Sequence, residues 1–151
     1  MVSSEAVPYA KTGGLADVAG VLPFELAKLG HDVILLLPHY GCLSESGQSF
    51  HSVCQLQVTT PHGLVDTSIE EDVIPVGKGD CRVRVWTIRN DAFFDRPGLY
   101  QDHGVDYTDN LDRFSFFCRA TIEVMAYLRT GCRWNTDILH LHDWQTALCA
   151  V

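Results

Sequence analysis

The run Val33–Leu37 is the feature that most limits how this chain can fold. It holds five consecutive apolar residues and is ended by Pro38. A strand with one solvated face alternates apolar and polar residues, whereas a continuous apolar run is typical of a strand covered on both faces. A segment with helical periodicity precedes this run. The order favours an α/β fold built on a parallel sheet.

The segment before this strand predicts a helix over about residues 15–29. Gly30 suits the position that ends a helix, and Pro23 inside it is expected to kink the helix or loosen it locally. Apolar residues recur at spacings of three and four, which predicts one buried stripe. The predicted stripe comprises Leu15, Val18, Leu22, Leu26 and Leu29.

The middle of the chain predicts short strands instead. The candidates are residues 53–58, 64–69, 73–76 and 82–88, with turns expected at TPHG and GKGD. This pattern indicates antiparallel hairpins inserted beside the parallel core. Residues 93–110 follow as a long loop rich in acidic and aromatic residues, and long loops in compact domains are often functional.

The last third again predicts alternating helix and strand. A helix is expected over about residues 109–128, capped by Thr108 or Asp109. Residues 138–141 form a strand candidate, and Asp143 is expected to cap a final helix that runs to Val151. The helix of residues 109–128 has a predicted buried stripe of Phe114, Phe117, Thr121, Val124 and Leu128.

The complete order of elements, with residues 1–4 as the end of a first strand, predicts a doubly wound α/β sheet with a β-hairpin insertion. The first strand is very short and the last helix ends while still apolar, so we expect the domain to be truncated at both ends.

Composition narrows the function classes. The net charge of −8 argues against a nucleic-acid partner, and no apolar run approaches a membrane-spanning length. The N-terminus lacks the features of a signal peptide, so a cytoplasmic location is expected. The six cysteines are scattered without a CxxC pair, which favours reduced structural thiols.

The loop from Lys11 to Gly14 is a candidate anion seat. It lies between the first strand and the first helix, at the sheet edge where ligands of open α/β sheets bind. Gly13 and Gly14 allow close approach to backbone N–H groups, and the helix terminus and Lys11 add positive charge. The loop matches neither the GxGxxG nor the P-loop fingerprint, so a tight turn with a solvated lysine is the alternative.

His140, His142 and Asp143 lie at the end of the last strand candidate and share that edge. Strand alternation places the two histidines on one face. Three interpretations stay open from the residues alone: an incomplete metal site, a core histidine beside a helix cap, and a histidine that faces the ligand. No metal is expected, and no nucleophile with its base is evident in the sequence.

These motifs together resemble one family. The stretch SSEAVPYAKTGGLADVAGVLPFELAKLGHDVILLLPHYG resembles the opening of bacterial glycogen synthases and plant starch synthases. The blocks FFDRPGLY, YTDNLDRFSFFCRA and DILHLHDWQTAL resemble three later blocks of that family in the same order. The weakest likeness covers residues 42–79.

The resemblance implies a GT-B glycosyltransferase, which has two Rossmann-like domains with the active site between them. Residues 1–151 would be an incomplete N-terminal, acceptor-side domain, inactive without the C-terminal nucleotide-binding domain. Lys11, Gly13 and Gly14 would contact the diphosphate of ADP-glucose. Asp17 would face the cleft, and His142 would contact the transferred glucose.

The implied activity is retaining transfer of glucose from ADP-glucose to the non-reducing end of an α-1,4-glucan, with no cofactor besides the donor. The expected partners are the nucleotide sugar, the glucan and the missing domain. A plant origin would imply a plastid location. The alternative is a stand-alone, non-catalytic glucan-binding module or a decayed gene product.

Overall fold

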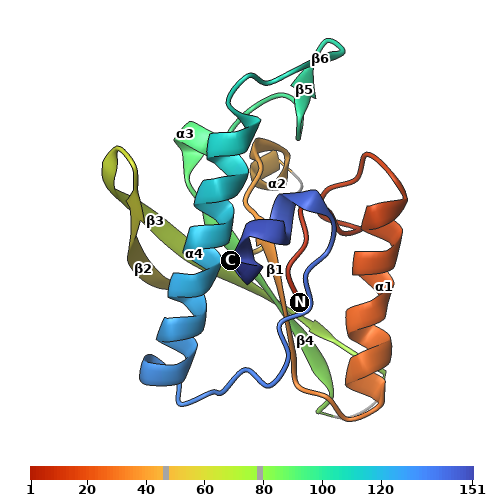
Figure 1. Cartoon of the computed structure of the whole chain (residues 1–151). Coiled ribbons are helices and arrows are strands. Elements are labelled where there is room, and N and C mark those ends of the chain that lie inside the picture. Colours follow the sequence, from red (N-terminus) through yellow and green to blue (C-terminus); the bar gives the residue numbers. More distant parts are fainter. Residues whose placement is uncertain (46–47, 78–79) are drawn as a thin grey trace.

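One mixed sheet runs through the structure, a computed structural model that describes residues 1–45, 48–77 and 80–151 (Figure 1). The four strands are β1 (Val33–Pro38), β2 (His51–Thr60), β3 (Gly63–Pro75) and β4 (Arg82–Arg89), in the spatial order β1-β4-β3-β2. The β1 and β4 strands are parallel, whereas β3 is antiparallel to both β4 and β2. The sheet therefore has a parallel half and an antiparallel half.

Two single-residue bridges extend the parallel half beyond β1. Val2 bridges Leu36 of β1 on one side and Leu141 on the other, in parallel in both cases. The Val2 N–H donates to His140 O at 2.8 Å, and His142 N–H donates to Val2 O at 3.0 Å. The strands predicted at residues 1–4 and 138–141 are thus present only as these bridges. The order across the parallel half is Leu141, Val2, β1, β4.

Every residue of β1 is buried, because helices cover both faces of the sheet. Ile34 and Leu36 lie in the core that contains the buried side chains of α4 (Asn110–Gly131). Leu35 and Leu37 lie in a second core with the buried side chains of α1 (Gly14–Lys28). Alternate residues of one strand contact opposite helices, which confirms the predicted doubly wound arrangement.

The buried face of α1 differs from the predicted leucine stripe. Val18 and Leu29 are 53% and 76% exposed. The buried positions keep the spacing of three and four but belong to small residues, which let the helix approach the chain closely; Gly20, for example, lies directly against Val7. The buried residues are Ala16, Ala19, Gly20, Pro23 and Ala27.

The end of α1 is as predicted. Gly30 has a φ of 93°, its N–H donates to Ala27 O at 3.0 Å, and the N–H of His31 donates to Leu26 O at 3.2 Å. This pair of bonds is the Schellman motif, which favours glycine at this position. Pro23 lies within the helix, which continues to Lys28.

The hairpin insertion is confirmed and is more regular than predicted. The predicted strands 64–69 and 73–76 are one strand, β3, paired with both neighbours. Pro61 and His62 form the turn between β2 and β3, as expected for TPHG. The GKGD turn lies partly outside the described residues. β4 belongs to both halves, so the hairpin continues the sheet instead of packing beside it.

The predicted loop of residues 93–110 contains short elements. The helix α3 (Asp91–Phe94) opens it, and β5 (Gln101–Asp102) pairs with β6 (Val105–Asp106). His103 and Gly104 form the intervening turn with φ values of 48° and 81°. The helix α2 (Gly41–Glu45) follows β1.

The helix α4 confirms its predicted stripe, since all five residues named for it are buried. Asp109, one of the two predicted cap residues, occupies the N-cap position. Its side chain forms no cap bond, because both of its carboxylate oxygens accept from Arg96, at 2.8 and 2.6 Å.

The final helix is a 3₁₀ helix, η1 (Trp144–Ala150), and it packs against α4. Asp143 caps it as predicted, with its carboxylate accepting from Trp144 N–H at 2.7 Å.

Candidate functional site

The strand order places one crevice at Val2, where the order of the parallel segments reverses from one side of Val2 to the other. Val2 is the first parallel segment along the chain, β1 and β4 follow on one side of it, and Leu141 comes last on the other side. Ligands of doubly wound sheets bind outside the carboxyl ends of the strands at such a switch point. The chain after Val2 leads to the Lys11–Gly14 loop, and the chain after Leu141 leads to His142. The two motifs singled out from the sequence therefore flank this switch point.

An open cleft of about 640 Å³ lies at this edge. It is bounded on one side by Gly13, Gly14 and Leu15 at the start of α1, and on another by the segment that follows His142. Trp144 also lines the cleft and is 53% exposed. The remaining lining residues are Glu5, Tyr100, Asp106, Tyr107, Asn110, Asp143 and Gln145.

The structure pairs Lys11 with Asp17. Lys11 Nζ lies 2.6 and 2.8 Å from the two carboxylate oxygens of Asp17, and both side chains are about half exposed. Neither residue lines the cleft itself, although Gly13 and Gly14 between them do. The lysine charge is therefore beside the cleft and is neutralised by Asp17, a pairing that the sequence does not predict.

Gly13 and Gly14 differ in what their N–H groups can do. The N–H of Gly13 donates to Glu5 Oε2 at 3.2 Å. Gly14 is the first residue of α1, and no side chain caps this helix. A Cβ placed on either glycine would meet nothing within 4 Å, so both positions face open space. Of the two glycines, Gly14 thus combines open space with an N–H donor at an uncapped helix terminus.

The backbone of His142 is fixed by hydrogen bonds, whereas one ring nitrogen has no hydrogen-bond partner among the described residues. Its N–H donates to Val2 O at 3.0 Å, and its carbonyl accepts from Thr146 Oγ1 at 2.9 Å. Its ring stacks on that of His140 at 4.3 Å. The Nε2 atom is buried and has no hydrogen-bond partner among the described residues. Burial, with smaller effects from His140 and the chain's amino terminus, lowers the pKa of His142, which therefore remains neutral at pH 7.

The metal interpretation of this segment finds no support in the geometry. Across residues 1–45, 48–77 and 80–151, no three His, Cys, Asp or Glu side chains are placed to hold one metal ion. Over the same residues, no helix is long and apolar enough to cross a bilayer. None of the six cysteines forms a disulfide, and Cys42 and Cys132 are exposed where structural thiols were expected.

Sequence reasoning missed Glu5, whose carboxylate connects several residues of the site. Only 3% of Glu5 is exposed, and its carboxylate accepts hydrogen bonds from Thr12, Gly13 and Tyr100. Burial alone raises the pKa of Glu5, but these hydrogen bonds together outweigh it and leave the pKa lowered. The only sequence signal was one acidic residue inside an otherwise small and apolar segment, directly after the first strand.

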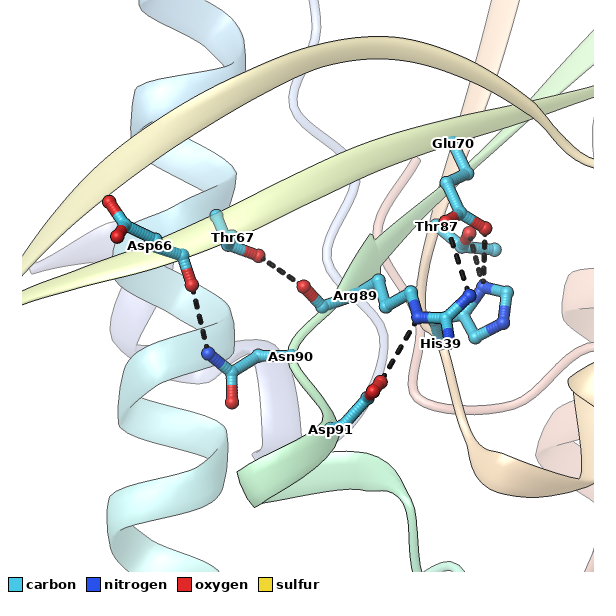
Figure 2. A network of polar contacts seen from close by, with 8 residues as sticks. All are labelled: His39, Asp66, Thr67, Glu70, Thr87, Arg89, Asn90 and Asp91. Atoms are coloured by element: carbon cyan, nitrogen blue, oxygen red, sulfur yellow. Dashed lines mark hydrogen bonds and ion pairs between the residues drawn. The ribbon is translucent and has the colours of Figure 1, made fainter.

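A second polar network lies elsewhere along the same edge (Figure 2). The Nδ1 atom of buried His39 lies 2.9 Å from Thr87 Oγ1 and 3.3 Å from Glu70 Oε2. Arg89 contacts Glu70 at 3.4 Å and Asp91 at 3.0 Å. These contacts join the ends of β1 and β4 to β3. No residue of this network lines the cleft, so we assign it to holding the antiparallel half of the sheet against the parallel half.

Comparisons with known proteins agree with this arrangement. The family model described as the starch synthase catalytic domain matches residues 1–151. A glycogen synthase of Syntrophotalea carbinolica is 38% identical over 149 residues, which are 98% of this chain and 29% of that protein. A glycogen synthase of Moorella thermoacetica is 40% identical over 148 residues, covering 97% of this chain and 27% of that protein. The chain therefore spans less than a third of the length of these relatives.

A solved structure supports the fold directly. The catalytic domain of starch synthase IV from Arabidopsis thaliana, bound to ADP and acarbose, superposes with a TM-score of 0.77 at 30% identity. The match covers 99% of this chain and 28% of that one. It confirms the expectation that this chain has the fold of part of a GT-B starch synthase catalytic domain.

Proposed function

Because this chain belongs to the starch synthase catalytic-domain family, we propose that it forms the acceptor-side wall of a glucosyltransferase active site. The complete protein transfers glucose from ADP-glucose to the non-reducing end of an α-1,4-glucan with retention. The observation that carries the proposal is the switch-point cleft, which sets the uncapped start of α1 opposite the Asp143–Gln145 segment, directly after His142. The ADP and acarbose bound by the Arabidopsis protein support a nucleotide donor and a sugar ligand here.

The donor diphosphate is assigned to the start of α1. As the glycosidic bond breaks, negative charge grows on the leaving diphosphate and positive charge on the sugar. The N–H groups of Gly14 and Leu15, and Lys11 once it leaves Asp17, stabilise this charge more strongly in the transition state than in the ground state. Asp17 acts through Lys11 in this scheme.

The transferred glucose is assigned to the other side of the cleft. Neutral His142 has one buried ring nitrogen without a partner in the described structure, and a sugar hydroxyl group satisfies it. That contact orients the sugar. The exposed ring of Trp144 supplies an apolar surface beside it. No general base is assigned to this chain, because the leaving phosphate itself assists the loss of the acceptor proton.

The direct test is transfer activity in a chimera. Residues 1–151 replace the matching segment of the Syntrophotalea carbinolica glycogen synthase, and labelled ADP-glucose or UDP-glucose is supplied with maltoheptaose. We expect transfer from ADP-glucose. Lys11→Ala should lower kcat/KM by about 100-fold or more, the usual cost of removing one charge-stabilising donor.

Lys28→Ala is the matched control, since Lys28 is also half exposed and also forms a 2.6 Å ion pair with a carboxylate of α1. Equal activities of the two lysine variants would refute the role of Lys11. An inactive chimera, combined with retardation of the isolated chain in glycogen-containing gels, would favour the non-catalytic glucan-binding module.

A further inference from the structure

Glu5 joins the Lys11–Gly14 loop to a segment far away in the chain. Its Oε1 accepts from Thr12 Oγ1 at 2.6 Å and from Tyr100 Oη at 2.7 Å. Its Oε2 accepts from the N–H groups of Thr12 and Gly13 at 2.5 and 3.2 Å. Tyr100 Oη also lies 2.7 Å from Ser4 Oγ. One carboxylate thus fixes two consecutive backbone N–H groups of the loop.

The partner tyrosine extends this connection across the cleft. The ring of Tyr100 lies 5.7 Å from that of Phe114 on α4 and 6.4 Å from that of Trp144. Glu5, Tyr100 and Trp144 all line the cleft. A shift of the Glu5 carboxylate would therefore move both the loop and a ring on the facing wall.

The contacts exclude a role for Glu5 in acid or base catalysis. Each carboxylate oxygen already accepts two hydrogen bonds, so neither is available to a substrate proton. The group is ionised and has no proton to give. A buried carboxylate with every acceptor site in use is suited to holding other groups in place.

We propose that Glu5 is a positioning residue for the donor, which holds the Lys11–Gly14 loop in the conformation that directs the N–H groups of Gly14 and Leu15 toward a nucleoside diphosphate. This inference rests on the proposed function for its ligand. It also reduces the number of N–H groups in the phosphate site predicted from the sequence. The N–H of Gly13 donates to Glu5, so only the N–H groups of the first residues of α1 are available to the anion.

The first measurement needs no ligand. Hydrogen exchange of the Thr12 and Gly13 amides is followed by NMR in the 151-residue chain and in Glu5→Gln. The substitution removes the negative charge and replaces one carboxylate oxygen, which accepts two of the four hydrogen bonds, with an NH₂ donor. We expect exchange at both amides to become faster by about tenfold or more, since their acceptor is weakened. Unchanged exchange would overturn the proposal.

The second measurement uses ADP as the probe. ADP is titrated into each folded variant, and the amide shifts of Gly14 and Leu15 report binding. Glu5→Gln should weaken ADP binding by about tenfold through loss of the loop conformation. Glu25→Gln is the matched control, because Glu25 is an exposed carboxylate of α1. A purely structural role for Glu5 would lower the melting temperature and leave ADP affinity in the folded state unchanged, and that result also overturns the proposal.

Two substitutions of Thr12 guard against a Glu5 variant that does not fold. Thr12→Val removes only the hydroxyl bond to Glu5, whereas Thr12→Ser retains it. We expect Thr12→Val to weaken ADP binding and Thr12→Ser to restore it, and equal affinities would overturn the proposal. If the unsubstituted chain binds no ADP, the titration is repeated in the Syntrophotalea carbinolica chimera, which supplies the remainder of the relative's chain. A chimera that also binds no ADP would refute the proposed function, whereas the exchange measurement decides separately whether Glu5 fixes the loop.

Discussion

Lys11 Nζ lies 2.6 Å from Oδ1 and 2.8 Å from Oδ2 of Asp17, so one carboxylate of α1 holds the lysine with both of its oxygens. In the free chain the cation beside the cleft is therefore already neutralised. An anionic ligand must compete with Asp17 for Lys11. Because the pair is half exposed, this competition is weak, and exposed pairs contribute only about 0–1 kcal/mol.

Asp17→Asn should therefore tighten the binding of ADP to the 151-residue chain. The substitution removes the competing carboxylate and leaves Lys11 uncompensated near the start of α1. We expect a gain of at most about fivefold in affinity, which corresponds to the weak exposed pair. Isothermal titration calorimetry with ADP measures it. Weaker binding by Asp17→Asn would mean instead that Asp17 holds Lys11 in its binding position.

Gly14→Ala should separate stability from ligand binding. A Cβ at Gly14 meets no atom within 4 Å, and alanine is the better helix former, so the free energy of unfolding should rise by up to about 1 kcal/mol. The same methyl group occupies the space through which a phosphate would approach the N–H groups. ADP affinity should therefore fall while the urea midpoint holds or rises. Unchanged affinity would place the phosphate elsewhere.

Gly20→Ala serves as the contrasting glycine on the same helix. Its Cβ would lie 2.7 Å from the carbonyl oxygen and 2.9 Å from the nitrogen of Val7, so the backbone must shift. Overpacking of this kind costs about 1–3 kcal/mol. We expect a lower urea midpoint for Gly20→Ala, the opposite of the result for Gly14→Ala.

His142 should titrate below pH 6.5, the ordinary value for histidine, because burial disfavours its charged form. The midpoint is read from the ring protons of His142 by NMR. His140→Ala should raise this midpoint by removing a neighbouring charge, but not restore the ordinary value, since burial is the larger cause. A midpoint at or above 6.5 in the unsubstituted chain would contradict the buried, neutral ring.

His39 should make the folded state less stable in mild acid. Burial lowers its pKa, opposed in part by Glu70 and Asp91, with Arg89 acting in the same direction as burial. Below about pH 6.5 the unfolded chain binds a proton at His39 that the folded chain resists, so this contribution to stability falls as the pH falls. Urea unfolding at pH 7.5 and pH 5.5 measures the loss.

The comparison with His39→Asn isolates this contribution from the other titrating groups. The unsubstituted chain should lose more stability over that interval than the variant does. The difference should be at most about 1.4 kcal/mol for each pH unit below 6.5. Equal losses in the two proteins would show that His39 gains its proton as readily in the folded chain as in the unfolded one.

The elements predicted well are those whose signal is local. The run Val33–Leu37 is buried on both faces because each face meets a helix, and the predicted stripe of α4 is buried because it packs into the core on one face of β1. The predicted buried face of α1 was wrong because two stripes of this helix, one of large apolar residues and one of small residues, have the same spacing of three and four. The stripe of small residues is buried since it permits closer packing, and side-chain size alone does not reveal that.

The same distinction applies to the site. Lys11 and His142 were both placed at the carboxyl edge because strand order is readable from the chain. The role of Glu5 was not readable, since its partners lie 7, 8 and 95 residues away and only the folded chain brings them together. The pairing of Lys11 with Asp17 was not predicted, because Lys11 lies in a loop and Asp17 in the first turn of α1, and only the fold shows how the loop meets the helix.

Arg113 is the other residue that only the fold explains. It lies in α4 with 0% of its surface exposed, and no ion pair compensates it among the described residues. Its Nε donates to Phe93 O at 2.7 Å, and its Nη1 donates to Leu99 O at 2.9 Å and to Asn110 Oδ1 at 2.7 Å. One guanidinium group therefore fastens two points of the 93–110 segment to α4, next to Tyr100 of the cleft.

Arg113→Met should destabilise the chain strongly, because it leaves two carbonyl groups without their donor in a buried setting. We expect a loss of about 2–5 kcal/mol in the free energy of unfolding. Arg113→Lys should not restore it, since an ammonium group cannot reproduce the planar fork that spans both carbonyls.

Arg129→Met, in the exposed last turn of α4, is the matched control and should change stability by no more than about 0.5 kcal/mol. Urea unfolding measures the loss, and limited proteolysis should show new cleavage within residues 93–110 of Arg113→Met. If Arg113→Met and Arg129→Met unfold at the same urea concentration, the contacts of Arg113 do not hold this segment in place.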